Sequence, residues 1–530
     1  MNTKALRQKI LDLAIRGKLV PQDPNDEPAE VLLERIRKQK QQMLKEGKLK
    51  KKDIKNDTII FKGEDNLHYE KFQDGSVKCI EDEIPFELPE GWEWTRLQSI
   101  TSILTDGTHK TPTYSEDGYI FLSSKNVTSG KIDWSNIMYI PESLHQELYS
   151  RLAPKIGDIL LAKNGTTGVA AIVDRKEVFD IYVSLALIRV VENIIDPLYI
   201  LNVIGSSFAQ DYFSSSLKGI GVPNLHLEHI RNTLIPIPPC LEQARINSRT
   251  DMLLPLAGQI EENREELKRL VSFLKSKILE LAIRGKLVPQ DPNDEPASVL
   301  LERIRAEKEE LIKQGQIKRD KKESVIFKGE DNSYYLRTEL ETMEIADELP
   351  YEIPESWEWA RIGNVFQVNP RNKLDDLLEV SFIPMPLIDD GFSGKHTSEV
   401  RVWEKIKSGF THFTEGDIGI AKITPCFENR KSVVFRNLKN NYGAGTTELH
   451  VLRPYASSIL PEYVLAYVKS SMFIDKGKQE FTGAVGQQRI GKDYVENSYF
   501  PIPPLAEQKR IVEQISTVYK QLDLISNALR

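Results

Sequence analysis

One stretch of this 530-residue sequence occurs twice, and this repeat constrains the fold more than any other feature. Residues 6–37 read LRQKILDLAIRGKLVPQDPNDEPAEVLLERIR, and residues 274–305 read LKSKILELAIRGKLVPQDPNDEPASVLLERIR, 268 positions later. Residues 13–29 and 281–297 are identical. A repeat of this length and similarity indicates two related half-molecules within one chain.

Shorter repeats follow in the same order in each half. They are IFKGEDN at residues 60–66 and 326–332, DEIPFELPEGWEWTRL and DELPYEIPESWEWARI at 82–97 and 347–362, GDI at 157–159 and 416–418, and LIPIPPCLEQARI and YFPIPPLAEQKRI at 234–246 and 499–511. Between these landmarks, residues 95–234 and 360–498 diverge, and each stretch has the length of a domain. The sequence therefore predicts one scaffold that carries two different variable domains.

Helical patterns flank the variable domains. Residues 1–46 read as helix, turn and helix, because the prolines of PQDPNDEP end the first helix. Apolar residues spaced by three and four form a heptad seam in residues 511–529 and again in residues 246–281. Pro255 interrupts the second seam and predicts a bend or a late helix start there.

The registers of the repeats predict a circular organisation. The C-terminal offset aligns Arg530 with Glu265, and the N-terminal offset aligns Met1 with Arg269. The two terminal helices together thus correspond to the central helix. We expect a pseudo-twofold α+β fold in which two long antiparallel coiled-coil helical elements separate two mixed α/β domains, one element being continuous and the other assembled from both ends of the chain. A helix of about 40 residues is about 60 Å long.

Within the variable domains, short apolar runs predict strands and longer ones predict helices. The expected strands include residues 158–162 and 183–190, and the expected helices include residues 198–213 and 461–473. Trp92 and Trp94, like Trp357 and Trp359, alternate and are expected to anchor a core from one face of a strand.

Composition excludes several classes of protein. No apolar run reaches the 18 residues of a membrane span, and Cys79, Cys240 and Cys426 lack the spacing of a zinc site. We therefore expect a cytoplasmic protein without a metal. Residues 486–492 have the spacing of a phosphate loop, but Asp493 stands where Ser or Thr would bind magnesium, so no nucleotide site is expected. The net charge of −7 argues against a protein that coats DNA non-specifically.

With these motifs in register twice, the chain resembles the specificity subunit of type I restriction-modification systems. The resemblance covers nearly the whole chain and rests on PIPPxxEQxRI, PExWEWxR followed by Leu or Ile, GDI, and LAIRGKLVPQ. It implies two target recognition domains, each reading one half of an asymmetric bipartite DNA sequence, with helices that set the gap and dock the methylation subunits.

The resemblance also implies the partners and the division of the chain. The partners are double-stranded DNA, two methylation subunits that bind S-adenosylmethionine, and motor-nuclease restriction subunits that use ATP and Mg, with no membrane involved. The chain itself is expected to be non-catalytic and without a cofactor. The expected segments are a helical region at 1–50, the first recognition domain with its lead-in at 51–240, a central spacer at 241–315, the second domain with its lead-in at 316–504, and a C-terminal helix at 505–530 that pairs with the central helix.

Candidate DNA-binding residues follow from the chemistry of base readout, in which Arg and Lys suit guanine, Asn and Gln suit adenine, and hydroxyls adapt to either. In the first domain they are Thr108, His109, Lys110, Ser124, Lys125, Asn126, Lys163, Asn164, Thr166 and Thr167. In the second they are Asn369, Arg371, Asn372, Lys373, Lys422, Thr424, Arg430, Lys431, Gln487, Gln488 and Arg489. Lys163 and Lys422 share the position after GDI, which suggests a phosphate contact.

The charge of the domains leaves other functions open. Residues 91–240 contain 12 Lys and Arg against 15 Asp and Glu, and residues 356–504 contain 18 against 17. Neither domain is a basic module, so we expect weak DNA binding by the chain alone. The alternative is a two-headed protein-binding adaptor without DNA specificity. A self-contained DNA methyltransferase is disfavoured, because the Asn/Asp-Pro-Pro-Tyr motif of amino-methyltransferases is missing.

Overall fold

The computed structural model describes residues 3–217, 224–319, 323–455, 459–484 and 486–529. The chain forms two compact units, Met1–Asn263 and Arg264–Arg530. The boundary falls inside one helix, α8 (Cys240–Ile283), so that each unit contains about half of it. Each unit is described by itself below.

Unit 1 begins with helices and a small antiparallel sheet, which we call the first lead-in sheet. The helices are α1 (Thr3–Ile15), α2 (Ala29–Lys45) and α3 (Lys51–Ile54), and the sheet contains β1 (Ile59–Lys62), β2 (His68–Lys71) and β3 (Val77–Cys79). The mixed domain that follows contains three sheets. One is the pair β12 (Leu234–Ile237) and β4 (Glu93–Arg96), and the second has four strands in the order β5 (Thr101–Asp106), β11 (Leu185–Val190), β8 (Ile159–Ala162), β9 (Ala170–Ile172). The third has three strands in the order β10 (Phe179–Ile181), β6 (Tyr119–Leu122), β7 (Met138–Ile140). Its helices are α4 (Glu142–Arg151), α5 (Pro197–Gly205), α6 (Ser207–Ser215) and α7 (Leu227–Asn232).

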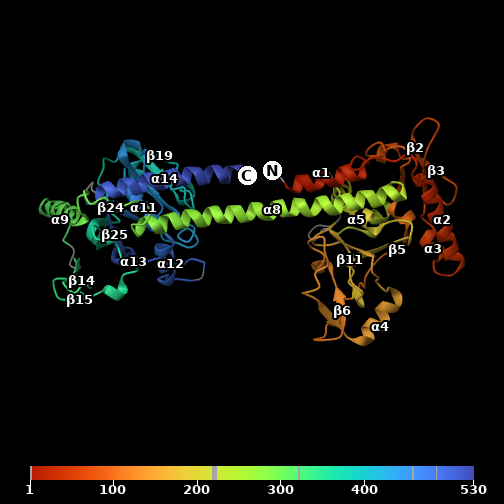
Figure 1. The fold of residues 1–530 in the computed structure, drawn as a ribbon, viewed down its shortest axis with the longest axis horizontal. Helices are drawn as coiled ribbons and strands as arrows, with labels where there is room; N and C mark the ends of the chain where they lie inside the picture. Colours follow the sequence, from red (N-terminus) through yellow and green to blue (C-terminus); the bar gives the residue numbers. More distant parts are fainter. Residues whose placement is uncertain (1–2, 218–223, 320–322, 456–458, 485, 530) are drawn as a thin grey trace. The chain divides into compact units, whose positions relative to one another are not determined.

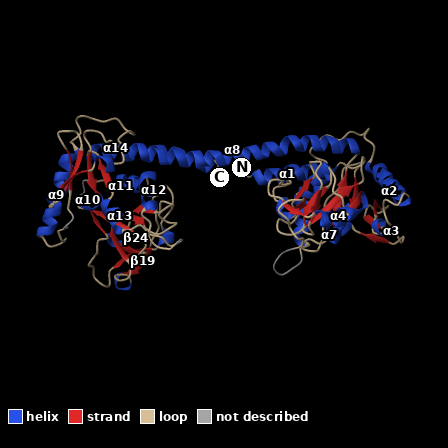
Figure 2. Ribbon diagram, turned by 90° about the horizontal axis from the view of Figure 1, so that it is seen from below, coloured by secondary structure: helices blue, strands red, loops and turns tan. Residues whose placement is uncertain are grey.

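Unit 2 repeats this order. After α9 (Ala297–Lys313) come the second lead-in sheet, of β13 (Val325–Lys328), β14 (Tyr334–Arg337) and β15 (Thr342–Glu344), and the pair β16 (Glu358–Arg361) and β25 (Tyr499–Ile502). Two larger sheets follow. The first has the order β17 (Phe366–Val368), β24 (Leu449–Pro454), β21 (Ile418–Ala421), β22 (Ser432–Val434). The second has the order β19 (Glu399–Val402), β18 (Glu379–Ile383), β23 (Tyr442–Gly445), β20 (Thr411–Thr414). The helices are α10 (Ile362–Val365), α11 (Pro461–Val468), α12 (Ser471–Gln479), α13 (Lys492–Asn497) and α14 (Leu505–Ala528). Figure 2 shows the strands of the larger sheets gathered in the mixed domain of each unit.

In each unit a terminal helix runs antiparallel to its half of α8 (Figure 1). In unit 1, Thr3 at the start of α1 hydrogen-bonds Glu261, far along α8. In unit 2, the Tyr519 hydroxyl donates to the Lys275 carbonyl over 2.9 Å, and the Arg264 Nε donates to the Leu529 carbonyl over 2.7 Å. Unit 1 thus joins α1 to the half of α8 that resembles α14, and unit 2 joins α14 to the half that resembles α1, which is the predicted circular equivalence.

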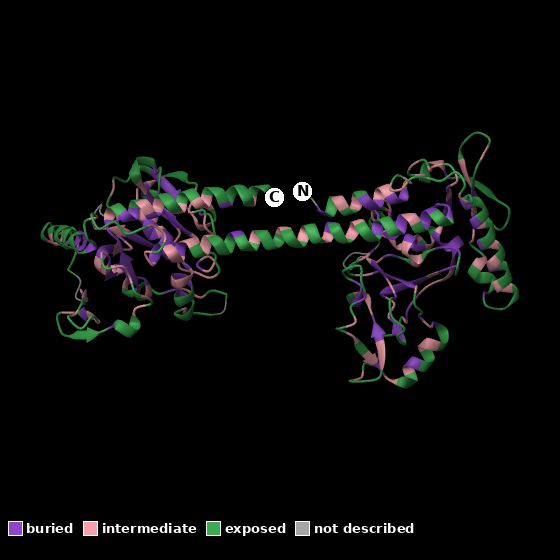
Figure 3. Ribbon diagram, in the orientation of Figure 1, coloured by how far each residue is buried: buried purple, intermediate pink, exposed green. Residues whose placement is uncertain are grey.

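Helix α8 is continuous through Pro255, so the predicted late start is wrong. Figure 3 shows that much of α8 beyond Asn263 and the last turns of α14 are exposed. Leu267, Leu270 and Phe273 are among the exposed apolar residues there, so the pairing of the two helices leaves an apolar stripe of α8 uncovered in this unit.

The helix predicted over residues 198–213 is two helices, α5 and α6, and the helix predicted over 461–473 is likewise two, α11 and α12. A serine separates the members of each pair. The Ser206 hydroxyl accepts from the Ala209 amide and caps α6, and the Ser470 hydroxyl accepts from the Phe473 amide and caps α12. A serine that satisfies the first free amides favours a new helix over continuation of the old one, and the apolar periodicity alone did not indicate this.

One tryptophan and one ion pair connect the mixed domain of each unit to its helices. The Trp92 Nε1 donates to Glu242 on α8 over 3.0 Å, and Arg245 on the next turn pairs with Asp26 over 2.5 Å. In unit 2 the Trp357 Nε1 donates to Glu507 on α14 over 2.8 Å, and Arg510 pairs with Asp294 over 2.6 Å. Burial raises the pKa of Glu242 and of Glu507, although the indole donors oppose the shift.

The two tryptophans of each motif lie in different cores, which corrects the prediction that they share one face. Trp92 packs in the large core of unit 1, whereas Trp94 packs in a small cluster with Ile60, Ile80 and Leu234 beneath the lead-in sheet. Their predicted role as core anchors is confirmed, since their exposed fractions are 4% and 2%.

The turn after each repeat helix requires glycine. Gly17 has a φ of +63°, and a Cβ at this residue would lie 2.5 Å from the Pro89 Cγ. Gly285 has a φ of +66° and the same close approach, 2.4 Å, to Pro354. The RGKLVPQ and PExW motifs therefore occur together because their residues pack against each other.

Gly17→Ala should destabilise unit 1 by roughly 2–5 kcal/mol, because it combines left-handed backbone strain with overlap against Pro89. Gly47→Ala is the matched control, since Gly47 has a φ of +71° but nothing within 4 Å of the added Cβ. The control should cost only about 1–2 kcal/mol. Urea unfolding followed by tryptophan fluorescence measures both, and equal losses would contradict the proposed contact.

Candidate nucleic-acid interface

The polar loops of the first mixed domain meet at one edge of its sheets. Strand β11 is antiparallel to β5 and β8, with Ala186 opposite Asp106 and Leu185 opposite Ala162. The loops that follow β5 and β8 therefore lie beside the start of β11. The loop after β6 joins them, because the Ser124 amide donates to the Ser184 Oγ over 3.0 Å. The structure thus brings together the three loops that the sequence singled out in this domain.

Only some of the candidate side chains project from this edge. His109, Lys110, Lys125 and Thr166 are exposed. Thr108, Ser124, Asn164 and Thr167 are half-buried. The two remaining candidates, Lys163 and Asn126, are buried.

The two buried candidates hold the loops in place. The Asn126 Nδ2 donates to the backbone carbonyls of Asp133 and Asn136 over 3.2 and 2.9 Å. The Lys163 Nζ lies 2.6 Å from Asp106 Oδ2, and only 4% of the residue is exposed. In this structure Lys163 neutralises a buried carboxylate and is not directed outward as a free cation.

The second mixed domain forms the equivalent edge from four segments. They follow β17 and β21, precede β24, and include residues 482–484 and 486–489 before α13. The Lys422 amide donates to the Glu448 carbonyl over 3.0 Å, and the Thr424 amide donates to the Gln488 carbonyl over 2.9 Å. These bonds place the candidates after GDI beside those near Arg489.

Several candidates of this domain make structural contacts. The Asn369 Oδ1 accepts from the Val451 amide over 2.9 Å, and the Asn372 Nδ2 donates to the Phe413 carbonyl over 3.0 Å. The Arg371 Nη1 donates to the Phe410 carbonyl, also over 2.9 Å. Lys373 and Gln487 are exposed, and Gln488 is half-buried.

Arg430 and Lys431 are also engaged in the fold. The Arg430 Nε donates to the Lys469 carbonyl over 2.9 Å and its Nη2 to the Ser471 Oγ over 3.1 Å, at the junction of α11 and α12. The Lys431 Nζ donates to the Met385 carbonyl over 3.2 Å. Arg430 is thus directed toward the helices, away from the polar segments around Lys422.

Glu448 is a residue of this edge that the sequence analysis missed. Its carboxylate accepts from Arg489 over 2.9 and 2.8 Å, and this hydrogen bonding lowers the pKa of Glu448, with smaller help from the charges of Arg489 and Lys422. The register of β24 against β21 identifies it, because Glu448 directly precedes Leu449, which lies opposite Ala421. Such pairing of distant strands is not readable from one sequence.

The GDI motif has a structural role at the opposite end of the strands. Asp158 accepts from Arg189 over 2.7 and 2.6 Å, and Asp417 accepts from Arg453 over 2.7 Å at the equivalent site. Burial raises the pKa of Asp417 although Arg453 opposes this. The motif therefore recurs because it holds the central strands of the large sheet together.

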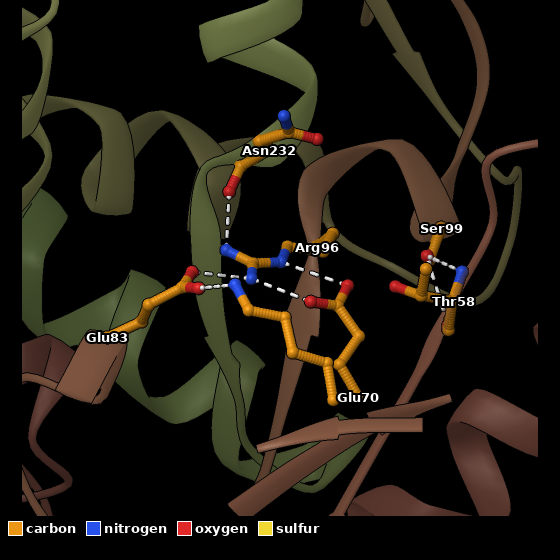
Figure 4. Close-up of polar contacts among 7 residues, drawn as sticks. Thr58, Glu70, Glu83, Arg96, Ser99 and Asn232 are labelled. Atoms are coloured by element: carbon orange, nitrogen blue, oxygen red, sulfur yellow. Dashed lines mark hydrogen bonds and ion pairs between the residues drawn. The ribbon is translucent and has the colours of Figure 1, made fainter. Parts of the chain in front are cut away.

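A buried arginine joins the first lead-in sheet to its domain (Figure 4). The Arg96 guanidinium donates to Glu70 over 3.1 and 2.8 Å, to Glu83 over 2.7 Å and to the Asn232 carbonyl over 2.9 Å. In unit 2 the equivalent Arg361 lies 5.8 Å from the ring of Tyr499, whose hydroxyl donates to Glu348. The two lead-in sheets are therefore attached at the same place by different polar groups.

The described residues contain no group of three or more His, Cys, Asp or Glu that could hold a metal ion. Across those same parts of the chain, no helix is long and apolar enough to cross a membrane.

Each unit thus combines a mixed domain that carries a polar edge with the helices on which that domain packs. A family model for the type I restriction modification DNA specificity domain matches residues 89–269 and 354–530, which is more than half of the chain. The chain therefore belongs to this family.

Individual relatives match over part of their length. The chain is 47% identical over 254 residues to the specificity subunit of the type I restriction enzyme EcoAI of Escherichia coli, covering 48% of this chain and 40% of the relative. It is 48% identical over 247 residues to the EcoEI specificity subunit of the same species, covering 46% and 39%. The alignments thus span about 40% of the length of these relatives.

A solved structure shares the fold. It is described as showing the basis of complex assembly and conformational transition of a type I restriction-modification system. The TM-score is 0.51 at 18% identity, and the match covers 84% of this chain and 94% of the other.

Lys163→Met should destabilise unit 1 by about 3–5 kcal/mol, because it leaves the buried Asp106 carboxylate without its cation. Lys422→Met is the matched comparison, since Lys422 occupies the same position but is half-buried, and it should cost less than about 1 kcal/mol. The double variant Asp106→Asn/Lys163→Met should recover part of the loss. Denaturant unfolding of the purified chain tests this, and an undisturbed Lys163→Met protein would show that the ion pair is dispensable.

Proposed function

We propose that this chain is the DNA sequence-recognition subunit of a type I restriction-modification complex. Each mixed domain reads one half of an asymmetric bipartite target through the polar edge described above. The observation that carries the proposal is that two domains of one family keep the same four-stranded sheet around the GDI motif, the same tryptophan contacts and the same GDI ion pair, but present different side chains at equivalent edges. A common scaffold with different edges is what two different half-sites require.

The exposed side chains at each edge are the proposed base-reading groups. In the first domain these are His109, Lys110, Lys125 and Thr166, with Thr108, Ser124, Asn164 and Thr167 beside them. In the second domain Lys373, Gln487 and Arg489 are the foremost, with Thr424 and Gln488 beside them. Lys422 is proposed to contact a phosphate, since a lysine amine binds a phosphate as a point charge and carries little sequence information.

The candidates that are hydrogen-bonded within the fold support the readers indirectly. Asn126 and Lys163 fix the loops of the first domain, and Asn369, Asn372, Arg371, Arg430 and Lys431 fix those of the second. Base readout needs donors and acceptors held in position, because a mobile side chain gives up conformational freedom on binding. These residues would affect specificity through the positions of their neighbours.

The partners follow from the same proposal. Two methylation subunits would dock on the helical regions and supply S-adenosylmethionine, and motor-nuclease subunits would supply ATP- and Mg-dependent cleavage, while this chain carries out no chemistry. The exposed apolar side chains along α8 in unit 2 suit such docking. The near-neutral charge of both domains favours a duplex held jointly by the recognition and methylation subunits.

We propose the five-segment division at residues 50, 240, 315 and 504 as the functional organisation. The helical segments would keep the gap between the two half-sites constant while the mixed domains determine the bases. The continuity of α8 through Pro255 is consistent with a spacer of fixed length.

The test is to co-express the chain with its methylation subunit and map methylated adenines across the host genome. We expect a split motif of two short defined halves around a fixed gap. Replacing residues 95–234 with the corresponding domain of another specificity subunit should change one half and leave the other intact.

A contiguous or palindromic motif would contradict two independent readers. A verified complex with an active methylation subunit that modifies no adenine would favour the two-headed protein-binding adaptor instead. The adaptor also predicts no salt-dependent binding to any duplex, which electrophoretic mobility shifts at several salt concentrations would show.

A further inference from the structure

The two units share one backbone feature at the proposed edges and differ in the side chain that it carries. An isolated antiparallel bridge joins Asn164 to Asn224 in unit 1, and the equivalent bridge joins Ile423 to Arg489 in unit 2. The next amide donates to the same lysine carbonyl in both cases, from Leu225 to Lys163 over 2.9 Å and from Ile490 to Lys422 over 3.0 Å. Residues 224 and 489 are therefore one structural position occupied by two different side chains.

The Arg489 guanidinium is fixed by hydrogen bonds that occupy only some of its N–H groups. Its Nε and Nη2 donate to Glu448 over 2.9 and 2.8 Å, and its Nη1 donates to the Gln487 carbonyl over 2.9 Å. Among the described residues, these contacts account for three of the five N–H groups of a guanidinium, so one on Nη1 and one on Nη2 are left. The side chain is 42% exposed and is therefore accessible to a ligand.

We propose that Arg489, oriented by Glu448, is a guanine-binding site in the half-site read by the second mixed domain. This inference rests on the proposed function and assigns one base to one residue. Guanine presents two acceptors, O6 and N7, on its major-groove edge, and a guanidinium with two parallel N–H groups matches them. Glu448 itself acts as a positioning residue, since a carboxylate cannot donate to either acceptor.

Charge distinguishes this assignment from a phosphate contact. A phosphate at Arg489 would approach the Glu448 carboxylate, and two anions at hydrogen-bonding distance from one guanidinium repel each other. The edge of guanine is uncharged and avoids this repulsion.

Unit 1 lacks both parts of this site. Ser184 directly precedes Leu185, which lies opposite Ala162, and so occupies the position of Glu448. Asn224 occupies the position of Arg489. The guanine site is therefore confined to the half-site read by unit 2.

The experiment maps adenine methylation by the full chain with its methylation subunit, comparing the natural chain with Arg489→Lys, Arg489→Ala and Glu448→Gln. We expect one guanine of a single half-site to become degenerate in all three variants, with discrimination at that position reduced about 10- to 100-fold. The other half-site and the gap should stay the same. Arg489→Lys keeps the positive charge, so it separates the fork geometry from the charge.

Arg436 and Glu462 provide the matched control. They form an exposed ion pair of 2.7 Å in the same domain, beyond the opposite end of β22, and Arg436→Lys and Glu462→Gln should leave the motif unchanged. In each variant, an unchanged half-site for the first mixed domain reports that the complex has folded and is active.

Uniformly weaker methylation with an unchanged motif would overturn the proposal and identify Arg489 as a phosphate contact. An unchanged motif with unchanged methylation would overturn it as well. Absence of a split motif in the natural chain would instead refute the proposed function, so the two failures are distinguishable.

Discussion

The hydrogen bond from a buried tryptophan to a helix glutamate is the interaction on which the rest of each unit depends. Trp92 reaches Glu242 and Trp357 reaches Glu507, and one helical turn later Arg245 and Arg510 pair with Asp26 and Asp294. These contacts connect the mixed domain, the helix that follows it, which is α8 in unit 1 and α14 in unit 2, and the repeat that carries the aspartate. Because both partners of each pair lie in repeated motifs, the recurrence of three separate motifs has one physical cause.

At the polar edges, hydrogen-bonding side chains stabilise the loops themselves. Many charged or amide side chains there are engaged in holding loops, among them Lys163 with Asp106 and Asn126 with two carbonyls. A loop fixed in this way presents its few exposed side chains with little freedom to lose on binding. Under the proposed function, the base-reading side chains of each edge are therefore fewer than its polar residues.

The architecture was predictable because the same sequence motifs occur in the same order in both halves of the chain. The offsets of the repeated motifs predicted two equivalent units with circularly permuted helices, and the contacts of Asp26 and Asp294 agree with them. The breaks at Ser206 and Ser470 were not predicted, because a cap satisfies local amides without changing the apolar period. Neither was the separation of Trp92 from Trp94, since alternation does not reveal which core lies on either side.

The polar edges were predictable only as loops. Residue type identified Lys163 and Arg489 as candidates, but one is buried against a carboxylate and the other is exposed beside one. The difference depends on Asp106 and Glu448, which are far away in the sequence and are brought close by strand pairing. Strand pairing cannot be inferred from a single sequence. The sequence therefore does not distinguish side chains that are available to contact a base from side chains that stabilise the loops.

The central claim is that two separate edges contact bases while the segment between the half-sites is not read. Dimethyl sulfate interference on the target bound by the chain and its methylation subunits tests this most directly, because methylation of guanine N7 blocks major-groove contacts. The guanines that belong to the two half-sites should interfere when methylated, whereas guanines placed at successive positions of the gap should not. A single continuous cluster, or interference throughout the gap, would contradict the account.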